Sequence, residues 1–195
     1  RQELESFAAL PAVTRDGHKV RVAANIELLE EIGNLRRYGA EGIGLYRTEF
    51  LYMNRPDTPS EEEHFATYRR VAEAVRPFPV TIRTLDAGGD KVLRSVPLQD
   101  ESNPALGLRS IRLCLREKGI FKAQLKGILR ASAAGNVRVM FPMVSGLGEL
   151  HEIRELLEES RADLRREGQA FDPHMPVGIM IEVPSAAVTA ELLAP

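Results

Sequence analysis

The sequence predicts an α/β fold of the (β/α)8 TIM-barrel type, present as an incomplete barrel of about the first five β/α units. Short apolar segments alternate with amphipathic helical segments along the 195 residues, which is typical of a buried parallel sheet. A doubly wound open sheet is the alternative architecture. The barrel is favoured because no glycine-rich dinucleotide fingerprint follows the first strand. In addition, charged residues end several strands instead of meeting at one switch point.

Five segments are expected to form parallel strands that lie next to one another in chain order. Each segment is short, apolar or alternating, and bounded by a turn or by a helical segment. The expected strands are residues 19–25, 43–46, 79–83, 137–141 and 177–181.

Five further segments carry apolar residues at helical spacing and are expected to connect these strands. Ser60 and Glu63 have the spacing of a capping box at the start of the second helix, and Gly39 is expected to end the first. Residues 84–106 keep no regular period, so they predict a long loop at the carboxyl end of the third strand. The expected helices are residues 26–38, 60–76, 107–117, 120–133 and 147–166.

The composition excludes several classes of protein. A formal net charge of −2 gives no basic field for nucleic acid, and no apolar run is long enough to insert into a membrane. The one cysteine, Cys114, cannot form an internal disulfide, and we expect it to be a small buried apolar residue. These features predict a cytoplasmic protein in a reducing compartment.

The domain organisation is expected to be simple. Residues 1–17 are interpreted as a linker or the end of a preceding helix, and residues 18–195 as the amino-terminal part of a barrel domain. The sequence starts without Met and ends inside a helical pattern, so both ends are expected to continue in a longer protein.

Three of the expected strands run into a charged residue, namely Arg47, Arg83 and Glu182. The carboxyl ends of parallel strands carry the active sites of α/β barrels. A guanidinium group binds phosphate or carboxylate through two parallel hydrogen bonds, and a carboxylate is a suitable ligand for Mg²⁺. The structural alternative for either arginine is an ion pair with a neighbouring acid such as Glu49 or Asp86, and for Glu182 it is a salt bridge.

The loop that follows Arg83 adds further candidate anion-binding groups. In RTLDAGGDK, residues 83–91, a Gly-Gly pair lets backbone N–H groups approach an anion, and Lys91 adds a positive charge. A plain turn is an equally good interpretation. Arg109 lies near a predicted helix amino end, which favours anions, whereas Arg112 is expected on a solvated helix face. Surface positions are expected for all four histidines, His18, His64, His151 and His174.

Five motifs follow one another along the chain. They are GAEGIGLYRTEFLYM (39–53), RTLDAGGDK (83–91), NPALGLRSIR (103–112), VRVMFPMV (137–144) and GIMIEVPSAA (178–187). The same motifs occur in this order in the phosphoenolpyruvate-utilising enzymes, and the chain resembles that family over nearly its whole length. Within the family, the DxGGDK segment most resembles the phosphoenolpyruvate–protein phosphotransferase branch, while GxGLxRTE is shared with the dikinase and synthase branches.

The resemblance implies a phosphoenolpyruvate-binding barrel within a longer, homodimeric enzyme. Such an enzyme moves the phosphoryl group of phosphoenolpyruvate to a histidine on a separate amino-terminal domain, and then to the carrier protein HPr of the sugar phosphotransferase system. The resemblance implies a Mg²⁺ ligand in Glu182. It implies contacts with phosphoenolpyruvate for Arg47, Arg83, Lys91 and Arg109.

No catalytic residue of that family is expected within this chain. Cys114 does not match the cysteine that protonates the enolate, and no histidine matches the phosphoryl acceptor. The alternatives are the barrel of a pyruvate phosphate dikinase or phosphoenolpyruvate synthase, and an inert or dimerisation fragment.

Overall fold

The computed structural model describes residues 8, 10–88 and 107–194, which contain a five-stranded parallel sheet in the order β1-β2-β3-β4-β5. The prediction of parallel strands adjacent in chain order is confirmed. Because every strand runs the same way, all five carboxyl ends meet at one edge of the sheet. The strands are β1 (Ala24–Ile26), β2 (Ile43–Tyr46), β3 (Val80–Arg83), β4 (Val137–Phe141) and β5 (Val177–Ile179).

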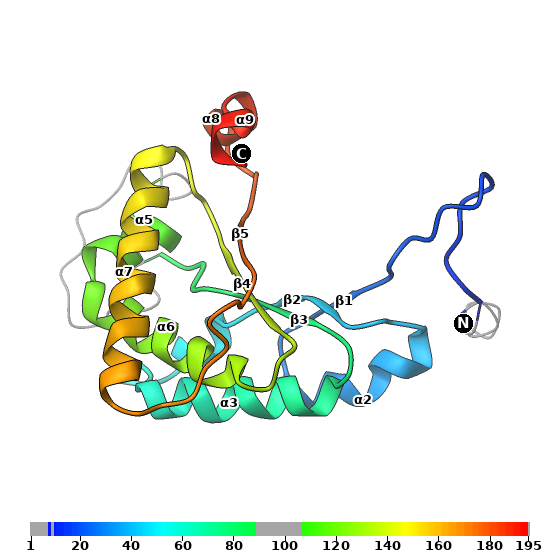
Figure 1. The fold of residues 1–195 in the computed structure, drawn as a ribbon, viewed down its shortest axis with the longest axis horizontal. Coiled ribbons are helices and arrows are strands. Elements are labelled where there is room, and N and C mark those ends of the chain that lie inside the picture. Colours follow the sequence, from blue (N-terminus) through cyan, green and yellow to red (C-terminus); the bar gives the residue numbers. More distant parts are fainter. Residues whose placement is uncertain (1–7, 9, 89–106, 195) are drawn as a thin grey trace.

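Helices connect the strands, and α3, α6 and α7 gather on one side of the sheet (Figure 1). α3 packs on α6, and α6 packs on α7. The α-helices of the described residues are α2 (Ile32–Leu35), α3 (Glu61–Val75), α5 (Ser110–Arg116), α6 (Lys118–Ser132), α7 (Leu147–Arg166), α8 (Pro184–Val188) and α9 (Ala190–Leu193). The 3₁₀ helices are η1 (Leu29–Glu31), η2 (Arg36–Tyr38) and η3 (Glu49–Tyr52).

The two faces of the sheet differ in polarity. Val80 and Ile82 of β3 pair with Val137 and Val139 of β4, and all four side chains are buried. The intervening residues point to the opposite face because side chains alternate along a strand. There, Arg83 lies beside Met140. The sheet therefore has one apolar face under the helices and one mixed face that carries the end of β3.

Local capping and periodicity set the ends of the two longest predicted helices. Ser60 Oγ accepts a hydrogen bond from the Glu63 backbone N–H at 3.3 Å, and Glu63 Oε2 accepts one from Ser60 N–H at 2.8 Å. The predicted capping box of α3 is thus confirmed. α7 has the predicted bounds, 147–166.

Two predictions for the amino-terminal part need correction. The strand expected at 19–25 begins only at Ala24, and Val20 and Val22 are 51% and 44% exposed. Lys19 forms an isolated antiparallel bridge with Val13, and Val20 N–H donates to the Ala12 carbonyl at 2.8 Å, so this segment pairs locally before β1 begins. The helix expected over 26–38 is broken into η1, α2 and η2. The boundary at residues 17 and 18 stays a prediction.

Other boundaries shift without changing the element type. The helix expected at 107–117 begins at Ser110, and the strand expected at 177–181 ends at Ile179. Most of the expected loop, including Lys91, lies outside the described residues. Across residues 8, 10–88 and 107–194, no helix is both long and apolar enough to cross a membrane.

The burial of Cys114 confirms the role expected from the sequence. Its side chain is 2% exposed within α5 and is a free cysteine. Burial raises the pKa of the thiol to about 12. Cys114 is therefore neutral at physiological pH and packs as a small apolar residue.

Candidate functional site at the carboxyl edge of the sheet

The three charged strand-end residues lie at the carboxyl edge of the sheet. Arg83 is the last residue of β3 and Arg47 directly follows β2. The sheet register pairs Tyr46 of β2 with Ile82 of β3. Arg47 directly follows Tyr46 and Arg83 directly follows Ile82, so the two arginines come at matching positions of adjacent strands. Glu182 lies three residues beyond the end of β5. Parallel strand polarity alone thus brings these residues to one edge.

Arg83 is held by two carboxylates. Its Nη1 lies 2.9 Å from Asp86 Oδ2, and its Nη2 donates to Glu49 Oε1 at 2.9 Å. The Arg83 side chain is 11% exposed, so both ion pairs are largely shielded from water. The structural alternative of an ion pair with Glu49 or Asp86 is therefore observed, and it fixes the direction of the guanidinium plane.

Asp86 gathers a second arginine into the same cluster. Its Oδ1 accepts a hydrogen bond from Arg109 Nη2 at 3.3 Å and another from Ser110 Oγ. Its backbone N–H donates to Glu49 Oε1 at 3.0 Å. We call Glu49, Arg83, Asp86 and Arg109 the rim cluster; its two cations and two anions balance.

The local backbone explains why Arg109 reaches Asp86. Arg109 forms an isolated antiparallel bridge with Gly88, and Ser110 N–H donates to the Ala87 carbonyl at 3.0 Å. Ser110 has a positive φ of 53°, which turns the chain sharply into α5. The segment after β3 and the start of α5 are thus tied together, although they are distant in sequence.

Arg47 and Glu182 make hydrogen bonds to backbone groups outside the rim cluster. Arg47 is exposed, and its backbone N–H donates to the Ile26 carbonyl at 3.0 Å. Glu182 is exposed, and its Oε1 accepts a hydrogen bond from the Met143 backbone N–H at 2.8 Å. The side chain of Arg112, expected on a solvated helix face, is 28% exposed, and its Nε lies 3.6 Å from Glu149 Oε1.

The described residues contain no group of three or more His, Cys, Asp or Glu side chains arranged to hold a metal ion. Glu182 offers one carboxylate that is anchored through a single oxygen. Mg²⁺ commonly takes one or two carboxylates and fills its other positions with water and substrate oxygens. Glu182 therefore fits as one Mg²⁺ ligand.

A buried polar network, missed by the sequence analysis, lies directly beneath the rim cluster. Gln124 Nε2 donates to Thr48 Oγ1 and to Tyr68 Oη, both at 3.1 Å. Tyr68 Oη lies 2.9 Å from His64 Nδ1, and His64 Nε2 lies 3.2 Å from Tyr52 Oη. The sequence held one signal for it. Gln124 and His64 interrupt the apolar stripes of α6 and α3, where a buried polar group needs a partner.

The surface position predicted for His64 is wrong. His64 is 0% exposed, whereas His18, His151 and His174 are exposed as predicted. Burial between two tyrosines lowers the pKa of the His64 imidazole to about 4. The polar residues next to His64 in the sequence led to the prediction of a surface position. At helical spacing, however, His64 shares a face of α3 with Tyr68 and Val71.

Comparison with known proteins identifies the family. The family described as "PEP-utilising enzyme, PEP-binding domain", where PEP is phosphoenolpyruvate, matches residues 1–195. The chain belongs to the PEP-utilising enzyme family. The family resemblance inferred from the motifs is thereby confirmed.

Three relatives of this chain carry one name, phosphoenolpyruvate-protein phosphotransferase. The Haemophilus influenzae protein is 50% identical over 192 residues, which cover 98% of this chain and 33% of the relative. The Staphylococcus carnosus protein is 48% identical over 194 residues, covering 100% of this chain and 34% of the relative. The Bacillus subtilis protein is 46% identical over 184 residues, covering 94% and 32%. The chain thus spans about a third of the length of these relatives.

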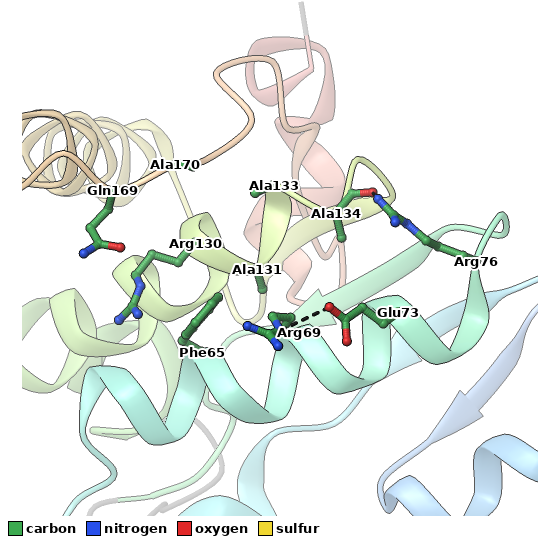
Figure 2. A pocket seen from close by; sticks show the side chains of 10 residues that line it. All are labelled: Phe65, Arg69, Glu73, Arg76, Arg130, Ala131, Ala133, Ala134, Gln169 and Ala170. Carbon is green, nitrogen blue, oxygen red and sulfur yellow. Dashed lines mark hydrogen bonds and ion pairs between the residues drawn. The ribbon is translucent and has the colours of Figure 1, made fainter.

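A pocket of this PEP-utilising domain lies away from the rim cluster. Figure 2 shows Arg69, Arg76 and Arg130 around it. The Arg130 Cζ atom lies 4.0 Å from the centre of the Phe65 ring. Its lining includes the segments that precede β3, β4 and β5, so it lies at the amino edge of the sheet. Arg76 donates to the Ala134 carbonyl just beyond α6. Cations are favoured at such helix carboxyl ends, which explains Arg76 and Arg130 without a ligand. Arg69 Nε lies 3.1 Å from Glu73 Oε1 within α3.

The buried state of His64 predicts a pH-dependent stability. The unfolded imidazole has a pKa near 6.5 and the folded one about 4, so the unfolded state binds more protons between these values. The free energy of unfolding should therefore decrease by about 3 kcal/mol as the pH falls from 6.5 to 4. Urea unfolding, followed by circular dichroism, measures this decrease.

Two variants isolate the His64 contribution from that of the carboxylates. His64→Gln should lose most of the decrease, while His151→Gln, at an exposed position of α7, should keep it. An unchanged pH profile for His64→Gln would mean that the imidazole has the same pKa in the folded and the unfolded protein.

Proposed function

We propose that this chain is the phosphoenolpyruvate-binding part of a phosphoenolpyruvate–protein phosphotransferase, and that it forms the first five units of a (β/α)8 barrel. The family match, the shared name of the relatives and the parallel sheet support this proposal. The observation that carries it is the rim cluster, because it aims two guanidinium groups at the carboxyl edge of a parallel sheet. That edge is where barrels of this kind bind substrate.

Arg47, Arg83, Lys91 and Arg109 are the proposed contacts for the phosphate and carboxylate of phosphoenolpyruvate. Arg83 is the best prepared of the described residues, since Glu49 and Asp86 hold its guanidinium in one direction. Its Nε is buried and has no hydrogen-bond partner among the described atoms. A substrate oxygen would satisfy that donor. The negative charge of the substrate would compete with the two carboxylates that now balance the arginines.

Phosphoryl transfer places negative charge on the non-bridging oxygens, so positioned cations are the main contribution that the protein makes. The fixed guanidinium of Arg83 costs no reorganisation when that charge develops. Glu182 would hold Mg²⁺, which neutralises phosphate and carboxylate charge when bound. The acceptor histidine, transfer to HPr and a homodimeric assembly in the cytoplasm belong to the same proposal for the full-length protein.

Transfer of labelled phosphate tests this proposal in the full-length protein that carries the chain. Labelled phosphoenolpyruvate, Mg²⁺ and HPr should together give labelled HPr and pyruvate. A reaction that instead requires ATP would favour a dikinase or synthase, which none of the relatives described here supports by name. No binding of phosphoenolpyruvate by calorimetry would favour an inert or dimerisation fragment.

Glu182→Gln is expected to raise the Mg²⁺ concentration needed for half-maximal turnover by about tenfold or more. Glutamine keeps an oxygen that can accept the Met143 N–H but removes the negative charge. Initial rates over a Mg²⁺ titration measure the change. The matched control is Glu191→Gln, another exposed glutamate close in sequence, and its titration should resemble that of the parent protein. Unchanged Mg²⁺ dependence for Glu182→Gln would remove Glu182 from the metal site.

A further inference from the structure

The backbone that carries Arg83 is held from beneath by side chains of two other elements. Thr48 Oγ1, at the start of η3, donates to the Arg83 carbonyl at 3.0 Å. Gln124 Oε1, in α6, accepts a hydrogen bond from Leu85 N–H at 3.0 Å. The peptide groups on both sides of Thr84 are therefore fixed, and Thr84 N–H itself donates to the Met140 carbonyl of β4 at 3.0 Å.

The hydrogen bonds of this arrangement have a definite direction. Gln124 uses its carbonyl oxygen for Leu85 N–H, so both of its amide protons go to Thr48 and Tyr68. The Thr48 hydroxyl proton is then free to donate to the Arg83 carbonyl. The Tyr68 proton can likewise go to His64 Nδ1, which places the imidazole proton on Nε2, facing Tyr52.

Burial makes this chain of hydrogen bonds difficult to rearrange. Thr48, Tyr68, His64 and Gln124 are each 0% exposed, so water cannot replace a lost partner. Burial also lowers the pKa of His64 to about 4 and raises that of Tyr68, so both groups stay neutral near pH 7. One arrangement of donors and acceptors is therefore maintained under the rim cluster.

We propose that Thr48 and Gln124 are positioning residues for Arg83. They fix the backbone on both sides of Thr84, and so determine where the Arg83 guanidinium stands when it meets the substrate. Glu49 and Asp86 direct the guanidinium itself, whereas Thr48 and Gln124 hold the strand end from which it projects. The inference rests on the proposed function only for its effect on phosphoryl transfer.

Isosteric variants of Thr48 separate positioning from packing. Thr48→Val removes the hydroxyl and keeps the volume, while Thr48→Ser keeps the hydroxyl. In the full-length protein, Thr48→Val should lower kcat for phosphoryl transfer from phosphoenolpyruvate by about ten- to a hundredfold, because small misplacements of a substrate-binding group have effects of this size. Thr48→Ser should restore most of the rate. Gln124→Leu should lower kcat at least as much as Thr48→Val.

A control variant accounts for general loss of stability. Ile153→Val removes one methyl group from a side chain of α7 that is 0% exposed and lies in a different element from Thr48 and Gln124. It should leave kcat unchanged when assayed well below the unfolding temperature. Equal kcat for Thr48→Val and Ile153→Val would overturn the positioning role, as would a Thr48→Ser variant as slow as Thr48→Val.

Amide hydrogen exchange tests the same inference without substrate. Exchange of the Thr84 and Leu85 amides should become at least about tenfold faster in Thr48→Val and Gln124→Leu than in Ile153→Val, because their local opening becomes easier. Unchanged exchange at these two amides would overturn the inference even if phosphoenolpyruvate is the substrate. If the parent protein does not use phosphoenolpyruvate, the proposed function fails, and faster exchange would still support the backbone-holding role.

Discussion

Replacement of Arg83 by lysine in the full-length protein is expected to lower phosphoenolpyruvate turnover by about a hundredfold or more, with the fold retained. Lysine keeps the positive charge at the end of β3. Lysine has a single ammonium nitrogen in place of the planar guanidinium group. It therefore cannot pair with Glu49 and Asp86 through two nitrogens and also offer a third, as the Nε of arginine would, to the substrate. The variant loses a preorganised hydrogen-bond donor. This loss raises the free energy of the transition state more than it lowers the stability of the folded protein. Steady-state phosphoryl transfer to HPr measures it.

Arg130→Lys is the matched control for Arg83→Lys. The Arg130 side chain is 13% exposed and makes ion pairs with two carboxylates, Glu61 and Glu62, much as Arg83 does. It lines the pocket at the amino edge of the sheet, away from the rim cluster. Its replacement should lower stability but leave turnover near that of the parent protein. Near-normal turnover in both variants would assign Arg83 a structural role.

Alanine at Gly127 is expected to lower the free energy of unfolding by about 3 kcal/mol, the upper part of the range for overpacked cores. A Cβ atom at this position of α6 would lie 2.4 Å from the His64 Cβ and 3.0 Å from the Phe65 backbone nitrogen in α3. The His64 Cβ is bonded directly to the α3 backbone and the Phe65 nitrogen is part of it, so neither atom can swing aside and α3 and α6 must separate. Urea unfolding followed by circular dichroism measures the loss.

Gly119 provides a control within the same helix. A Cβ atom there meets nothing within 4 Å, so Gly119→Ala should stabilise the protein by up to about 1 kcal/mol through the higher helix propensity of alanine. A Gly127→Ala variant as stable as Gly119→Ala would show that α3 and α6 are not in such close contact. Because Gln124 lies one turn before Gly127, we also expect Gly127→Ala to disturb the network beneath Arg83.

The sequence predicted the elements whose determinants are local. The capping box at Ser60 and Glu63 and the bounds of α7 are encoded within a few residues, and the structure confirms both. The alternation over 19–25 shows the limit of such patterns, since residues before Ala24 alternate without pairing in the sheet. A pattern of period two predicts which way side chains point, but only a neighbouring strand makes the segment a strand.

The sequence also placed Arg47, Arg83 and Glu182 at one edge of the sheet. In a parallel sheet all carboxyl ends meet at one edge, and the sequence shows which charged residues follow the strands. The partners of those residues were not predictable in the same way. Asp86 joins Arg83 to Arg109, although Asp86 and Arg109 are 23 residues apart in sequence, and Glu182 accepts a hydrogen bond from the Met143 backbone N–H.

Taken by itself, the sequence determined the family motifs, the order of the strands and the edge at which charge collects, since each depends on residue type and local spacing. Only the tertiary structure decided that Arg83 is clamped by two carboxylates and that Gln124 and His64 form one buried network beneath it. These contacts join α3, α6, η3 and the end of β3. They depend on the packing distance between helices, which is set by the close approach at Gly127 and which no local pattern encodes.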